Sequence, residues 1–198
     1  MYKINELPTP CFVIDEGKLE ENLKILHQVE ERTGAKILLA QKCFSCFSEY
    51  PLIRKYISGT TASGLYEARL GKEEMGLENH VYSPAYRPQD MEELAQICDH
   101  IIFNSEKQLR TYLPVLKASG TAKAGLRINP ECSTQEGHAI YDPVRPAPAW
   151  ASAPAILQTN WPILWTVFIF IPSVNRIRMI WKPRCAPWKK NSASGFLK

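Results

Sequence analysis

Short apolar runs alternate with amphipathic segments along much of this sequence, and this alternation restricts the fold more than any other feature. Up to Pro143, runs typical of strands recur roughly every 20 to 25 residues, and each is followed by helical spacing. We predict strands at residues 11–14, 36–40, 60–62, 80–83, 100–103 and 124–129. Such repeats favour an α/β fold with a parallel sheet and right-handed crossovers.

Residues with capping chemistry stand at the ends of the helical segments. Asp15 precedes the first segment, Gly76 follows the third, and Asn104 or Ser105 precedes the fifth. The helices after the first are predicted at residues 45–57, 66–75, 88–97 and 105–117. A complete (β/α)8 barrel needs about 250 residues, so the 198-residue chain is expected to form only part of one.

The composition and the helical spacing of the sequence change after Pro143. All five tryptophans lie at Trp150 or later, no Asp or Glu follows Asp142, and prolines interrupt any helical spacing. We interpret residues 1–143 as the N-terminal part of a barrel and residues 144–198 as a frameshifted, non-native tail. Codons for residues 164–197 can be chosen so that a neighbouring frame encodes an acidic α/β continuation. The alternative is a disordered basic tail that binds an acidic partner.

The bulk composition excludes several classes of function. With 45% apolar residues, 22% charged residues and a net charge of +4, the chain has the composition of a globular protein without a nucleic-acid footprint. The apolar run at residues 161–172 is short and holds two prolines, so no membrane span is expected. The polar N-terminus and six cysteines fit a cytoplasmic protein without a disulfide framework.

Lys42 is the leading candidate for chemistry. It follows the apolar run at residues 37–40 and precedes a predicted helix, so it would lie at the carboxyl end of a barrel strand, where barrel active sites are built. A lysine there can form a Schiff base with a carbonyl compound. The plain alternative is a solvated surface lysine.

Ordered motifs around this lysine resemble a known family. They are PTPCFVID at residues 8–15, LAQKCFS at 39–45, GTTASGLYEARLG at 59–71, IFNS at 102–105 and GLRINPECSTQEGH at 125–138. Together they resemble the carboxynorspermidine/carboxyspermidine decarboxylases, which belong to the alanine racemase and ornithine decarboxylase-like proteins that use pyridoxal 5'-phosphate (PLP).

The resemblance implies a PLP-binding (β/α)8 barrel followed by a C-terminal β-domain, which this chain would lack, and a homodimer with shared active sites. It implies that Lys42 carries PLP and that the parent protein decarboxylates a carboxylated polyamine during polyamine biosynthesis. The chain itself is then expected to be truncated and inactive. A non-enzymatic PLP-binding barrel protein is the alternative, because it would use the same lysine.

Three further residues are candidates for binding the cofactor. Ser63 would end the third predicted strand and reach a cofactor oxygen, although it could instead cap a helix. Arg127 lies within a predicted strand and would meet an anion or a polar network, with a salt bridge at the rim as the alternative. His138 would lie near the mouth of the site, as a ring-stacking residue or a plain loop histidine.

The remaining cysteines and histidines suggest no metal centre. Cys43 and Cys46 have CxxC spacing but no second pair to complete a zinc site, so we interpret them as packing or mouth residues. His27, His80 and His100 are scattered along the sequence, and no metal cluster is expected from them.

Overall fold

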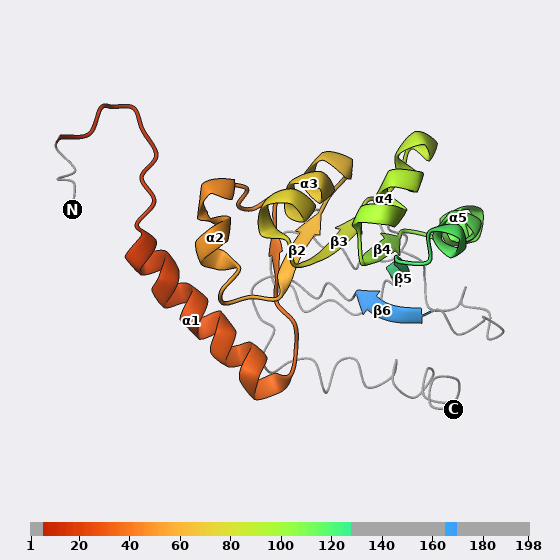
Figure 1. Ribbon diagram of the computed structural model, residues 1–198, viewed down its shortest axis with the longest axis horizontal. Coiled ribbons are helices and arrows are strands. Elements are labelled where there is room, and N and C mark those ends of the chain that lie inside the picture. The colour runs from red at the N-terminus through yellow and green to blue at the C-terminus, as the bar shows by residue number, and fades with distance from the viewer. Residues whose placement is uncertain (1–5, 128–164, 170–198) are drawn as a thin grey trace, which may run out of the picture.

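The computed structural model describes residues 6–127 and 165–169. Its centre is a six-stranded parallel sheet in which each strand pairs with the next one along the chain (Figure 1). The strands are β1 (Leu38–Ala40), β2 (Gly59–Ala62), β3 (Glu78–Tyr82), β4 (His100–Phe103), β5 (Lys123–Arg127) and β6 (Trp165–Ile169). Sequential parallel order is the order of strands in a (β/α)8 barrel, so the predicted α/β class is confirmed.

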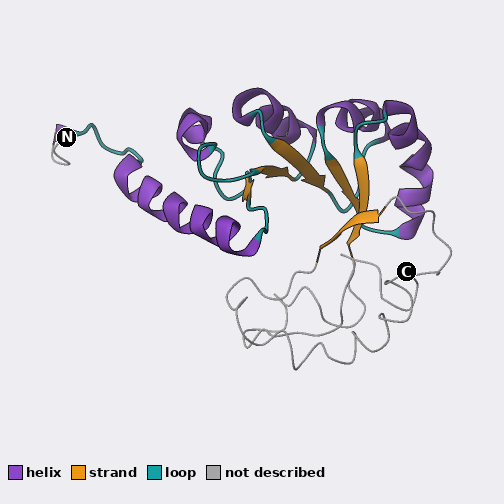
Figure 2. Cartoon of the chain, turned by 60° about the horizontal axis from the view of Figure 1, so that its bottom comes forward, coloured by secondary structure: helices purple, strands orange, loops and turns teal. Residues whose placement is uncertain are grey.

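Helical segments precede and connect the strands, and those that connect them lie on one side of the sheet (Figure 2). They are α1 (Glu16–Thr33), η2 (Phe47–Glu49), α2 (Tyr50–Ile53), α3 (Leu65–Leu70), the π-helical η3 (Gly71–Met75), η4 (Pro88–Asp90), α4 (Met91–Ile97) and α5 (Glu106–Ser119). The helix predicted at residues 45–57 is much shorter than expected, and its α-helical part covers only Tyr50–Ile53. Within the described residues, no helix is long and apolar enough to cross a membrane.

The predicted helix caps are confirmed. The Asp15 side chain accepts a hydrogen bond from the backbone N–H of Lys18 at 3.1 Å, and Ser105 accepts one from Gln108 at 3.3 Å. Gly76 follows η3 with φ of 65°, in the left-handed region that glycine adopts without steric cost. Local sequence therefore determines where these helices begin and end.

Alternation along the strands separates two faces of the sheet. One face packs against the helices and forms the main apolar core, in which Val81, Ile101 and Leu126 are fully buried beside residues of α3, α4 and α5. The intervening residues, among them His80 and Tyr82 on β3, point to the opposite face, which is called the inner face below. The inner face is the one that would line a barrel interior.

Gly71 permits a close approach between helix and sheet. A Cβ atom at this position would lie 2.4 Å from Thr60 Oγ1 and 2.9 Å from Asn79 Oδ1. Both contacts are inside van der Waals separation, so a larger residue would fit only if the Thr60 and Asn79 side chains moved.

The strand predicted at residues 11–14 is wrong. These residues form no strand, and Phe12, Val13 and Ile14 are exposed. An apolar run becomes a strand only where a neighbouring strand receives its backbone hydrogen bonds, and β1 is an edge strand in the described sheet. The sixth strand of the sheet is instead β6, from the part of the sequence that we interpret as non-native. The proposed boundary at 143/144 lies outside the described residues.

Candidate active site

The carboxyl ends of the parallel strands bring together most of the predicted site residues at one edge of the sheet. Lys42 follows β1, Ser63 follows β2, and Arg127 is the last residue of β5. Tyr82 ends β3, and Asn104 directly follows β4. In a parallel barrel these ends form the mouth in which active sites are built, so we call this set of five residues the lysine edge.

A tethered turn holds Lys42 at this edge. Its neighbour Gln41 is 1% exposed; the amide nitrogen of Gln41 donates to the carbonyl of Glu67 at 2.8 Å, and its amide oxygen accepts from the Tyr50 hydroxyl at 3.3 Å. Burial, and then the Glu67 carboxylate, raise the pKa of Tyr50, so its hydroxyl stays protonated as the donor. The backbone N–H of Cys43 closes the turn on the carbonyl of Ala40 at 2.9 Å. Lys42 itself is exposed, with its backbone fixed from both sides.

Ser63 lies at the start of the turn into α3. Its backbone N–H donates to the Glu67 carboxylate at 2.7 Å, so Glu67 caps the N-terminal end of the helix. The Ser63 side chain is not the capping group, because the N-cap residue is Gly64. The Ser63 hydroxyl is therefore exposed at the lysine edge with no capping role.

Arg127 belongs to a polar chain that joins three strands. One guanidinium nitrogen donates to the Tyr82 hydroxyl at 2.7 Å, and that hydroxyl donates to Asn104 Oδ1 at 2.8 Å. The guanidinium carbon also lies 4.8 Å from the centre of the Tyr82 ring, a cation–π distance. Arg127 is 8% exposed, so this network compensates part of the cost of burying its charge. The polar network expected around Arg127 is present.

Two residues of the lysine edge were missed from the sequence. Asn104 was considered only as a helix cap, and Tyr82 was placed in a strand without a role. The sequence does not give the register between strands. Tyr82 pairs with Ile102 on β4, and Phe103 pairs with Leu126 on β5. This register brings Tyr82 into contact with Asn104, 22 positions along the chain. His138, the fourth predicted site residue, lies outside the described residues.

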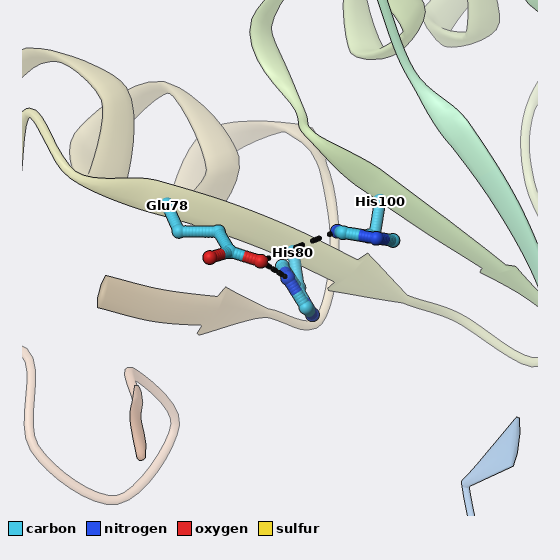
Figure 3. A group of neighbouring side chains, drawn as sticks. All are labelled: Glu78, His80 and His100. Carbon is cyan, nitrogen blue, oxygen red and sulfur yellow. Dashed lines mark hydrogen bonds and ion pairs between the residues drawn. The ribbon is translucent and has the colours of Figure 1, made fainter. Parts of the chain in front are cut away.

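A second polar cluster lies on the inner face near the amino ends of β3 and β4, and it corrects the view that the histidines are scattered. His80 pairs in register with His100, and both lie beside Glu78 (Figure 3). The ring centres of His80 and His100 are 4.3 Å apart. Parallel pairing thus makes neighbours of two histidines that the sequence separates by a whole β-α repeat.

Comparison with known proteins identifies close relatives. No family model matches the sequence. The chain is 39% identical over 167 residues to a carboxyaminopropylagmatine decarboxylase from Synechocystis. It is 41% identical over 140 residues to a carboxynorspermidine/carboxyspermidine decarboxylase from Herminiimonas arsenicoxydans, and 38% identical over 138 residues to one from Campylobacter jejuni. These alignments cover 84%, 71% and 70% of this chain.

Solved structures agree with these relatives. Carboxynorspermidine decarboxylase from Campylobacter jejuni, complexed with norspermidine, matches with a TM-score of 0.63 and 32% identity over 74% of this chain. Diaminopimelate decarboxylase from Helicobacter pylori, complexed with L-lysine, matches with a TM-score of 0.61 at 18% identity, which shows a shared fold. The matches cover 36% and 38% of those chains.

The chain spans 35–43% of the length of these curated relatives. Sequence identity near 40% over most of this chain and the fold agree on one assignment. The aligned part of this chain is therefore homologous to a portion of the carboxynorspermidine/carboxyspermidine decarboxylases.

Proposed function

We propose that the protein to which this sequence belongs is a PLP-dependent decarboxylase of a carboxylated polyamine, either carboxynorspermidine or carboxyspermidine. The observation that carries the proposal is Lys42, held by a tethered turn at the lysine edge within the motif LAQKCFS. The decarboxylase names of the relatives support the reaction class, and the norspermidine in the Campylobacter jejuni structure supports a polyamine substrate.

The chemistry of the lysine edge fits PLP. Lys42 offers an exposed amine for covalent attachment to an aldehyde, Ser63 offers a hydroxyl, and Arg127 offers a positive charge fixed by Tyr82. PLP, when bound, supplies an electron sink for the charge that remains on the α-carbon after loss of carbon dioxide. We propose that the cofactor is bound by Lys42, Ser63, Arg127 and, from the sequence motif alone, His138.

Four side chains of the lysine edge have a task in this proposal. Lys42 Nζ would hold the cofactor and would be placed to carry a proton during the reaction. Arg127, oriented by its hydrogen bond to Tyr82, presents a fixed positive charge to an anionic or electron-rich group. Ser63 would donate a hydrogen bond to the cofactor and so orient its ring. We propose that the groups for the phosphate and the substrate amines come from beyond the described residues.

The domain boundary, assembly and location are also proposals. We propose that residues 144–198 arise from a shifted reading frame, that the parent protein is a cytoplasmic homodimer, and that the present chain is inactive alone. The DNA sequence around codons 143 to 165 tests the first of these directly. An intact frame that encodes the printed residues, confirmed in independent isolates, would contradict it.

The experiment is an assay of carbon dioxide release from carboxynorspermidine and from carboxyspermidine in the presence of PLP. It compares the 198-residue chain with a frame-restored chain and with the restored chain carrying Lys42→Ala. We expect turnover only by the restored chain with Lys42 intact. PLP binding without turnover would identify a non-enzymatic carrier instead, and turnover by the Lys42→Ala variant would refute the role of the lysine.

A further inference from the structure

We propose that Glu78, His80 and His100 form a binding site for a divalent transition-metal ion, with Zn²⁺ as the preferred occupant. Each residue offers one ligand atom, and these atoms lie within 4.8 Å of one another on the inner face of the sheet (Figure 3). Two imidazole nitrogens and a carboxylate oxygen are a common set of protein ligands for zinc. The proposal is independent of PLP chemistry at the lysine edge.

Backbone register builds this cluster. Glu78 and His80 are two residues apart on β3, so their side chains point to the same face. His100 begins β4 and pairs directly with His80. All three ligands therefore come from paired strands, which hold ligand positions more rigidly than loops do.

Distances within the cluster suit a tetrahedral ion. Glu78 Oε1 lies 2.8 Å from His80 Nε2 and 3.5 Å from His100 Nδ1. Bonds of about 2.1 Å around a tetrahedral zinc place its ligand atoms about 3.4 Å apart. Small side-chain rotations would bring all three atoms to that spacing, and a fourth position would remain for water or another ligand.

His100 supplies a second, independent observation. It is 7% exposed, and its Nδ1 atom is fully buried without a hydrogen-bond partner, although it faces the Glu78 carboxylate. A buried polar atom left without a partner is unfavourable, because it has lost its hydrogen bonds to water. A bound cation would satisfy this atom.

Lys36 modulates the cluster without blocking it. Its ammonium group pairs with Oε2 of Glu78 and leaves Oε1 directed at both histidines. The exposed ammonium orients the carboxylate but also repels a cation. Removing this charge should therefore strengthen metal binding.

The test is a titration of the whole 198-residue chain with Zn²⁺ alone, in competition with a chelator of known affinity. We expect one site that His100→Ala weakens by about 100-fold or more, since loss of even an outer-shell partner costs 10- to 100-fold. His27→Ala is the matched control, because His27 also faces a glutamate, Glu31 at 3.7 Å, but lies on exposed α1. Equal affinity of His100→Ala and the unmodified chain would overturn the proposal.

Two further measurements keep the proposal falsifiable if His100→Ala does not fold. Lys36→Met changes only an exposed side chain, and we expect it to tighten Zn²⁺ binding several-fold, whereas unchanged or weaker binding would count against the site. Co²⁺ in place of Zn²⁺ should give visible bands without thiolate charge-transfer absorption. A thiolate band would assign the metal to cysteines such as exposed Cys43 and overturn the assignment.

Discussion

The two faces of the sheet are made by the same strands but carry different kinds of side chain. Toward the helices, Val81 on β3 and Ile101 on β4 are completely buried in an apolar core. On the inner face, their immediate neighbours Tyr82 and His100 take part in polar clusters. The face covered by helices resembles the core of any α/β protein, whereas the inner face concentrates amine, guanidinium, imidazole and carboxylate groups.

Because of this difference, substitutions on the two faces should affect different properties of the protein. Substitutions on the face toward the helices should change the free energy of unfolding, because they remove close packing. Substitutions at the lysine edge should change ligand binding with smaller effects on folding.

The largest effect is expected at Lys42. Borohydride reduction in the presence of PLP should label Lys42, and Lys42→Ala should lose this label completely, because no other residue of the lysine edge carries an amine. Peptide mapping identifies the labelled residue, with Lys36→Ala and Lys72→Ala as matched controls that keep it. A label on Lys36 or Lys72, or unchanged labelling of Lys42→Ala, would remove Lys42 from the site.

The second prediction concerns Cys98, which is buried in the main core. Burial, and then the neighbouring Asp99, raise the pKa of this thiol to about 12, so only about 1 in 10,000 molecules is a thiolate at pH 8. We expect Cys98 to react with iodoacetamide at least about 1,000-fold more slowly than exposed Cys43. Mass-spectrometric time courses compare the two sites, and similar rates would show that the core opens readily.

The third prediction tests the core on the same face. Ile101→Ala should lower the free energy of unfolding by about 2–5 kcal/mol, because the residue is fully buried among apolar neighbours. Lys24→Ala, which removes an exposed ion pair with Glu20 on α1, should lower the free energy of unfolding far less, because water and salt screen exposed charges. Urea unfolding followed by circular dichroism measures both. Equal losses of unfolding free energy in the two variants would mean that packing in this core does not determine stability.

The smallest effect is expected from Tyr82→Phe. This change removes one hydroxyl that joins Arg127 to Asn104, which should weaken PLP binding by about tenfold and cost only about 1 kcal/mol of stability. Tyr112→Phe, which loses a hydrogen bond to the carbonyl of Tyr86 on the other face, should leave PLP affinity unchanged. PLP absorbance titrations compare the variants, and equal affinities would assign the Tyr82 hydroxyl a purely structural role.

Local patterns in the sequence predicted much of the fold and part of the site. Five of the predicted strands are present, and Asp15, Ser105 and Gly76 cap helices as expected, since capping depends on residues a few positions apart. Lys42 and Ser63 lie at the carboxyl ends of strands, as predicted, whereas Arg127, predicted within a strand, is the last residue of β5. The run at residues 11–14 was predicted wrongly because its apolar pattern carries no information about a pairing partner.

The sequence by itself determined the alternation of strands and helices, the helix caps and the position of Lys42 after β1, because each depends on neighbours along the chain. Tertiary structure alone decided which distant residues meet. Parallel register placed His80 beside His100 and brought the Tyr82 hydroxyl to Arg127. These contacts join residues on separate strands, and a slip of one residue in pairing would turn each side chain to the opposite face.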